Sequence, residues 1–263
     1  MSTFSIEHKE YLKKEKVRKI QIYLTQITIL VLFFGIWELL AKLSIINTFI
    51  YSSPSKIIKT IINLFQTHKL FNHISITAYE VIISFIISSC FSLIIATILW
   101  WNSFISKVFE PFITIINSLP KVALGPLIIV WVGASIKSII VMSLTISLFI
   151  TIINFYQAFI STNENYIILL KSFKASKKDI FMKAIIPCNK KAIINTLKIN
   201  MSMNFIGVIM GELLVSKNGL GYLIMYGSQV FNITLIITSI FIISILAFIL
   251  YYIIIYFEKK LSK

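Results

Sequence analysis

Residues 163–187, NENYIILLKSFKASKKDIFMKAIIP, form the interior stretch of this chain that is long enough and charged enough to fold in water. Their pattern predicts two short amphipathic helices joined by a tight corner, which we call the elbow. Ser161 with Glu164, and Ser176 with Asp179, have the spacing of capping pairs, so one pair could begin each helix. From these residues alone, a docking device and an ordinary basic loop are both open interpretations.

Each predicted elbow helix carries one apolar face. On the first helix this face consists of Tyr166, Leu169, Leu170 and Phe173. On the second helix it consists of Ile180, Phe181, Ala184 and Ile185, while the neighbouring lysines are expected to stay in water.

The composition around the elbow is that of an integral membrane protein. Of 263 residues, 57% are hydrophobic and 13% are charged, which is about half the charged share of a soluble protein. Several uncharged runs reach the roughly 20 residues that a helix needs to cross the hydrocarbon layer, and they do not alternate in polarity as barrel strands do. The net charge of +15 is carried by lysines at the ends of these runs. We therefore expect contact with anionic membrane lipid and no binding of nucleic acid.

The chain reads as one all-α transmembrane domain, residues 20–257, with a basic cytoplasmic segment at 1–19 and a short tail at 258–263. Its six predicted spans lie at about 20–43, 74–101, 104–132, 138–160, 192–215 and 231–257. Because the basic residues gather before the first span and in the elbow, both termini and the elbow are expected in the cytoplasm.

The third predicted span is interrupted by Pro111, Pro120 and Pro126. Proline removes a backbone donor and kinks a helix, and broken helices at membrane depth are tolerated where they are buried in protein or line a cavity. We expect this segment to face the interior or a pathway, with Pro120 and Pro126 shaping a gate. Simple packing kinks are the alternative.

No motif of an enzyme is present: the sequence has no P-loop, GxSxG, HExxH or CxxC, and its histidines and cysteines are too scattered for a metal site. Energy for transport would then come from an ion gradient or from a partner subunit. Glu80 and Glu212 are the candidate carboxylates for an ion relay, but both lie near the predicted outer ends of their spans. We interpret them as interfacial anchors, which favours the partner.

Four stretches in the same order resemble permease subunits of ABC importers of the nitrate, sulfonate and taurine branch, which includes permeases for thiamine-precursor pyrimidines. They are IWELLAK at 36–42, SSPSKI at 52–57, EPFITIINSLPKVALGPLIIVWVGASIKSIIV at 110–141 and GELLVSKNGLGYLI at 211–224. The elbow also resembles the loop that such permeases insert into their ATPase subunit, with Ala175, Ser176 and Pro187 at matching positions.

The resemblance implies a type I importer in the bacterial cytoplasmic membrane. Two copies of the permease would form the pathway. Separate ATPase subunits would bind ATP, so that this chain needs no cofactor. An external binding protein would deliver a small anion or heterocycle such as a sulfonate, nitrate or pyrimidine. The outer turn with Glu212, Gly219 and Gly221 would either form a bend or touch the binding protein. The residues expected to dock the ATPase are Tyr166, Leu169, Leu170, Phe173, Lys174, Ala175 and Ser176. A self-sufficient secondary transporter or channel is the alternative.

The elbow departs from the family pattern at four positions. Ile168, Leu169 and Leu170 stand where the family usually has Glu-Ala-Ala. Lys174 stands where a glycine is usual, at a corner that favours a left-handed backbone. Either Lys174 adopts that backbone at a cost of roughly 1 to 2 kcal/mol, or the corner has a different shape.

Overall fold

The computed structural model describes residues 6–261, and every regular element among them is helical. The first five residues of the predicted N-terminal segment and the last two of the predicted tail lie outside this range. The elements are α1 (Ile6–Lys42), α2 (Thr48–Tyr51), α3 (Pro54–Gln66), α4 (Lys69–Trp101), α5 (Ser103–Ser118), a 3-10 turn (Lys121–Leu124), α6 (Gly125–Val132), α7 (Ile136–Ile160), α8 (Glu164–Ser172), α9 (Lys177–Ile180), a π-helical turn (Phe181–Ile185), α10 (Ile186–Cys188), α11 (Lys190–Val215), α12 (Leu220–Gln229) and α13 (Ile233–Leu261).

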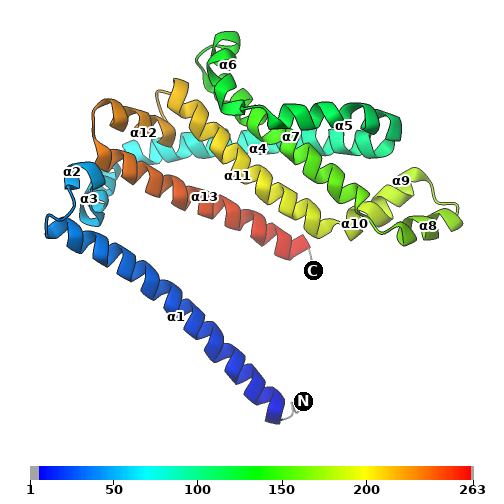
Figure 1. Ribbon diagram of the computed structural model, residues 1–263, viewed down its shortest axis with the longest axis horizontal. Helices are drawn as coiled ribbons and strands as arrows, with labels where there is room; N and C mark the ends of the chain where they lie inside the picture. The colour runs from blue at the N-terminus through cyan, green and yellow to red at the C-terminus, as the bar shows by residue number, and fades with distance from the viewer. Residues whose placement is uncertain (1–5, 262–263) are drawn as a thin grey trace.

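Five helices, α1, α4, α7, α11 and α13, are long and apolar enough to cross a membrane, and a sixth span is present if α5 and the segment Lys121–Val132 count as one. The axis between those two parts bends by 82°. The predicted all-α membrane fold is confirmed, and its irregular third span is this bent pair. α8 and α9 lie at one end of the bundle, and α2, α3 and α12 lie at the other end (Figure 1).

A buried polar seam holds α4, α7 and α11 together, and the sequence analysis did not predict it. Asn204 donates to Ser88 at 2.9 Å and accepts from Ser143 at 2.9 Å. Asn200 also donates to Ser88 at 2.9 Å and accepts from Thr151 at 2.9 Å. All five side chains are fully buried. Because hydrocarbon offers no competing partner, such bonds join membrane helices.

Small residues bring the seam together. A Cβ added at Gly207 of α11 would overlap the backbone of Ser143 on α7, and one added at Gly211 would lie 3.0 Å from the Cα of Ile139. Glycine at these two positions therefore permits the close approach of α7 and α11 that the hydrogen bonds need.

Helix α1 diverges from the bundle over most of its length (Figure 1). Only 6% of its apolar stretch is buried inside the protein. It touches the bundle near its C-terminal end, where Phe34 and Trp37 lie 5.8 and 6.3 Å from the ring of Phe241 on α13. The basic residues before the first span belong to the same continuous helix, which begins at Ile6.

Candidate functional site

The elbow consists of α8, a corner, α9 and the π-helical turn, as the sequence predicted, but the first cap differs. Asn163, and not Ser161, begins α8 by accepting a hydrogen bond from the amide of Asn165 at 2.9 Å. Ser161 donates to the carbonyl of Ala158 and so belongs to the end of α7. The pair predicted for the second helix is confirmed, because Ser176 accepts from the amide of Asp179 at 3.1 Å.

Lys174 adopts the left-handed backbone, with φ of 56°. Its amide donates to the carbonyl of Lys171 at 2.9 Å, and the amide of Ala175 donates to the carbonyl of Leu170 at 3.0 Å. This is the Schellman arrangement that usually places glycine at the left-handed position. Of the two outcomes left open for this corner, the structure has the one in which Lys174 carries the strain.

The predicted apolar face of α8 divides into an outward and an inward part. Phe173 is 75% exposed, and Tyr166 and Leu169 are each 53% exposed. Leu170 is half-buried, and together with Ala175 it packs against a cluster formed by Phe155, Phe159, Ile180, Phe181 and Ile185. Leu170 and Ala175 therefore hold the elbow to the bundle, while the other three apolar residues face away from it.

Aromatic contacts clamp the second half of the elbow to the ends of α4 and α7. The ring of Phe181 lies 4.9 Å from Trp100 on α4 and 5.3 Å from Phe159 on α7. Lys177 donates to the carbonyl of Trp101 and lies over the ring of Trp100 at 5.7 Å. The predicted apolar face of the second helix is buried against the bundle. A displacement of the elbow would therefore be transmitted to both spans.

Asp179 is the acidic residue at the start of α9. The hydroxyl of Ser176 donates to its carboxylate, and the ammonium of Lys183 lies 2.9 Å from it. These two interactions lower the pKa of Asp179 to about 2. The start of α9 is thus held by a charged pair as well as by its cap.

At the opposite end of the bundle, three side chains cap the first amides of α12. Gly219 donates to Nδ1 of His73 at 3.0 Å, and Leu220 donates to the hydroxyl of Thr77 at 2.8 Å. Gly221 donates to Oε2 of Glu212 at 2.5 Å, and Thr77 donates to Oε1 of Glu212 at 2.6 Å. We call this arrangement the outer lock, because it ties α4 and α11 to the start of α12.

The interpretation of Glu80 and Glu212 as interfacial anchors is wrong. Glu80 is fully buried and Glu212 is 1% exposed. Helix α4 begins at Lys69, earlier than predicted, so Glu80 lies about 16 Å along it at 1.5 Å per residue. Burial of Glu212 follows from its role in the outer lock.

Gly219 and Gly221 lie beneath the surface of the outer turn. Gly219 has φ of 104°, and a Cβ there would overlap the carboxylate of Glu212. A Cβ at Gly221 would lie 2.7 Å from the Cβ of Glu212. Both glycines are buried, whereas Lys217 and Asn218 are exposed. Any contact between this turn and another protein would therefore involve Lys217 or Asn218.

In the bent segment, Pro120 lies at the break between α5 and the 3-10 turn, and Pro126 lies in the first turn of α6. Pro126 is at a position that suits proline, and Pro111 lies inside α5, which continues past it. Pro120 and Pro126 are both exposed on the single chain, whereas Gly125 and Ile128 of α6 are buried, so the segment turns one side to its own bundle and these two prolines outward. Among residues 11–256, whose side chains the structure describes, no group of three or more His, Cys, Asp or Glu could hold a metal ion.

Comparison with known proteins adds the family to this geometry. Residues 88–263 match the sequence model of the family described as binding-protein-dependent transport system inner membrane component. A probable ABC transporter permease protein of Haemophilus influenzae is 28% identical over 217 residues, which cover 82% of this chain and 88% of the relative.

Two further relatives are named for what they transport. The formylaminopyrimidine transport permease protein ThiX of Halalkalibacterium halodurans is 27% identical, over 71% of this chain and 74% of the relative. A putative aliphatic sulfonates transport permease protein, SsuC of Bacillus subtilis, is 21% identical, over 84% of this chain and 80% of the relative. Among solved structures, a chain of the MetNI methionine ABC transporter in an inward-facing conformation is similar in fold, with a TM-score of 0.62 at 17% identity, covering 74% of this chain and 95% of that one.

Proposed function

This chain belongs to the family of inner membrane components of binding-protein-dependent transport systems, and on that premise we propose that its elbow docks the ATPase subunit of an ABC importer. The chain is a permease subunit, embedded in a membrane, and not an enzyme. The family implies an ATPase and a substrate-binding protein as partners.

The observation that carries the proposal is the exposure of Tyr166, Leu169 and Phe173 on an elbow that is itself rigidly held. Large apolar side chains gathered on a polar segment mark a contact with another protein. Aromatic residues are enriched at the core of such interfaces, and the exposed Lys171 and Lys174 would lie at the polar rim of this face. Ala175 and Ser176 act indirectly, by shaping the corner and capping α9.

The clamp of Phe181 between Trp100 and Phe159 supports a mechanical role. ATP would be bound by the partner alone. Closure of two ATPase subunits would draw two elbows together, and each elbow would rotate the ends of α4 and α7 as a rigid body. The polar seam keeps α4, α7 and α11 moving as one unit.

A second copy of this chain would complete the pathway. Val130 and Trp131 of α6 are 79% and 73% exposed on the single chain, and α6 follows the 82° bend. We propose that this face meets its counterpart in a homodimer and that the break at Pro120 shapes the gate there. A single permease copy per two ATPase subunits in purified complex would overturn this part.

The substrate would be a small anion or heterocycle, such as a sulfonate, nitrate or pyrimidine. Support comes from relatives named for formylaminopyrimidine and aliphatic sulfonates. The test is to purify the external binding protein and identify the ligand that it retains. A metal ion or peptide as that ligand would contradict the assignment.

We place the chain in the bacterial cytoplasmic membrane with the elbow and both termini in the cytoplasm. Support comes from the basic residues before the first span and in the elbow. Topology reporters fused at the C-terminus and after Asn218 should report opposite sides of the membrane. Equal activity of both fusions would contradict this orientation.

Docking itself is tested by co-expression of the permease with its ATPase. Phe173→Asp should abolish co-purification of the ATPase, because it places a charge in the apolar contact, while membrane insertion is kept. Asn165→Asp, which adds the same charge at an exposed polar position of α8, is the matched control and should retain the ATPase. Co-purification at the same level with both variants would overturn the proposal.

A further inference from the structure

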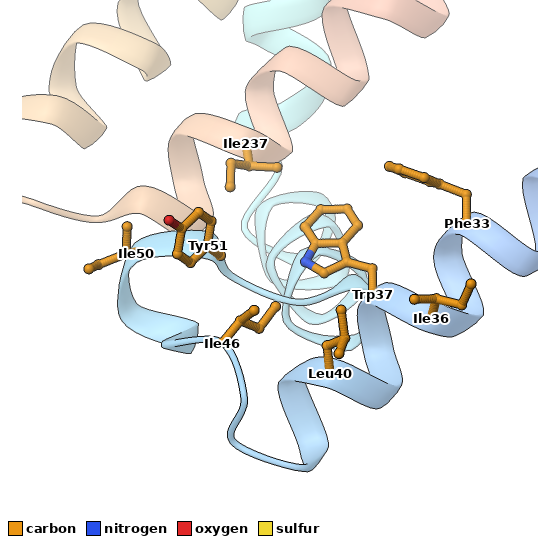
Figure 2. Close-up of a pocket in the computed structure, with 8 residues that line it drawn as sticks. All are labelled: Phe33, Ile36, Trp37, Leu40, Ile46, Ile50, Tyr51 and Ile237. Atoms are coloured by element: carbon orange, nitrogen blue, oxygen red, sulfur yellow. The ribbon is translucent and has the colours of Figure 1, made fainter.

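An apolar groove of about 490 Å³ opens between α1, α2 and α13. Figure 2 shows the side chains that surround it, and only the indole nitrogen of Trp37 and the hydroxyl of Tyr51 are polar among them. The lining residues are Phe33, Ile36, Trp37, Leu40, Ile46, Ile50, Tyr51 and Ile237. A volume of this size is within the range of small-molecule sites.

The groove is placed where hydrocarbon surrounds the protein. Two of its walls, α1 and α13, are helices long and apolar enough to span a membrane. It forms because α1 touches α13 at Phe34 and Trp37 and then diverges. The third wall is the turn and α2 at the end of the first span, so the groove ends near a membrane surface.

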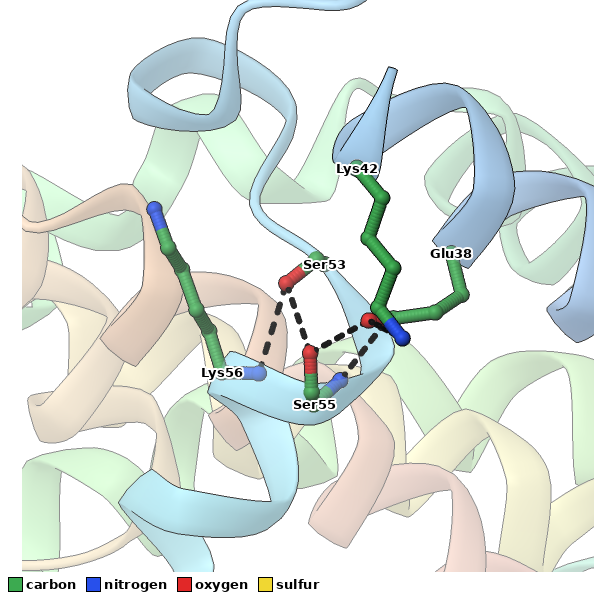
Figure 3. A network of polar contacts seen from close by, with 5 residues as sticks. All are labelled: Glu38, Lys42, Ser53, Ser55 and Lys56. Atoms are coloured by element: carbon green, nitrogen blue, oxygen red, sulfur yellow. Dashed lines mark hydrogen bonds and ion pairs between the residues drawn. The ribbon is translucent and has the colours of Figure 1, made fainter. Parts of the chain in front are cut away.

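A polar cluster lies where the end of α1 meets the start of α3, and Figure 3 shows its members Glu38, Lys42, Ser53, Ser55 and Lys56. The carboxylate of Glu38 accepts from the amide and hydroxyl of Ser55, at 3.0 and 2.7 Å, and pairs with Lys42 at 3.8 Å. The ammonium of Lys56 donates to the hydroxyl of Thr48 at 2.8 Å. No carboxylate among residues 11–256, whose side chains the structure describes, forms an ion pair with Lys56.

Thr48 links this ammonium to the helix that forms one wall of the groove. It begins α2, the helix that supplies Ile50 and Tyr51 to the groove wall. An ammonium bound to the helix that walls an apolar groove, together with a tryptophan and a tyrosine that line the groove, has the chemistry of the membrane interface. The apolar part suits an acyl chain, and the ammonium suits a phosphate.

We propose that this groove binds one acyl chain of an anionic phospholipid, whose phosphate is held by Lys56. Lys42 does not take this role, because Glu38 already balances its charge. The proposal does not depend on how the elbow docks. Helix α1 buries little surface against the bundle. The bound lipid would help to hold α1 to the bundle.

The test uses the full-length chain in lipid nanodiscs, with Trp100, Trp101 and Trp131 replaced by phenylalanine. Trp37 is then the remaining tryptophan, and it is excited at a wavelength that the tyrosines do not absorb. Quenching by phosphatidylglycerol with brominated acyl chains is compared with quenching by phosphatidylcholine brominated in the same way. We expect an apparent preference for the anionic lipid of about five-fold. Lys56→Gln should remove this preference, and Lys42→Gln, the matched control, should retain it.

Equal quenching by the two lipids would overturn the proposal, and so would an unquenched Trp37, which would mean that protein covers the groove. Because the tryptophan replacements could disturb the contact of Trp100 with Phe181, native mass spectrometry of the unaltered chain supplies a second measurement. It should detect retained phosphatidylglycerol that the Lys56→Gln chain loses. Equal retention by the two chains would also overturn it.

Discussion

The amide of Lys174 donates to the carbonyl of Lys171 at 2.9 Å, and this bond closes the corner of the elbow with a lysine in the left-handed conformation. The strain lies in the backbone of Lys174, and the hydrogen bonds around it are those of a complete helix C-terminus. The corner therefore has the shape that a glycine would give it, at a higher energy.

Replacing Lys174 by glycine should stabilise the elbow, because glycine adopts a left-handed backbone without the roughly 1 to 2 kcal/mol penalty of other residues. We expect slower amide hydrogen exchange in α8 and α9, by up to about ten-fold for 1.4 kcal/mol. Lys174→Ala is the control, since it removes the same side chain and keeps the penalty. Equal protection in the alanine and glycine variants would show that the backbone is not the cause.

Replacing Gly219 by alanine should destabilise the outer turn. The residue has φ of 104°, and its added Cβ would overlap the carboxylate of Glu212. The cost should exceed about 1 to 2 kcal/mol, since a strained backbone and a steric overlap add together. Gly35→Ala is the matched control, because nothing lies within 4 Å of a Cβ at that position. Thermal unfolding of the purified protein should show a clear decrease in the unfolding temperature for Gly219→Ala and none for Gly35→Ala.

Replacing Glu212 by alanine should open the outer lock. The amide of Gly221 would then be a buried donor without an acceptor, at a cost of about 1 to 3 kcal/mol. Amide exchange at Gly221 and Tyr222 should accelerate, while exchange in α8 stays unchanged. Glu164→Ala, at an exposed glutamate, serves as the control. Unchanged exchange at Gly221 would contradict the capping role.

The stability of the elbow should fall in acid. The pKa of Asp179 in the folded chain is about 2, below its ordinary value of about 3.9. A lowered pKa stabilises the fold at pH above about 4, and that contribution is lost as the pH falls toward 2. Amide exchange in α9, corrected for its intrinsic pH dependence, should show this loss between pH 4 and 2. The Asp179→Asn variant should not show this pH-dependent loss of protection. If the loss persists in Asp179→Asn, another titrating group causes it.

Apolar length was sufficient to predict α7 and α11, whereas α1 and α4 begin earlier than predicted, at Ile6 and Lys69. Helix α7 was expected at about 138–160 and runs from Ile136 to Ile160, and α11 was expected at about 192–215 and begins at Lys190. Uncharged runs bounded by lysines leave little freedom in where such helices begin and end. The bend near Pro120 also followed from proline chemistry.

The side on which each residue packs could not be predicted in the same way. Leu170 and Phe173 lie on one face of α8, yet one packs inward and the other faces out, because neighbouring spans decide which part of a face is covered. The polar seam had a signal that was overlooked, since Ser84, Ser88 and Ser92 recur every four residues along α4. The residues of α11 that pair with this serine stripe could be identified only from the fold.

The most direct test of the account is photo-crosslinking from the elbow to the ATPase. A benzoylphenylalanine at position 173 or 169, in the intact importer, should crosslink to the ATPase subunit. The same group at Leu214, an exposed apolar position of α11 near the outer lock, should not. Crosslinks from position 173 to lipid or to permease alone, with none to the ATPase, would contradict the docking role of the elbow.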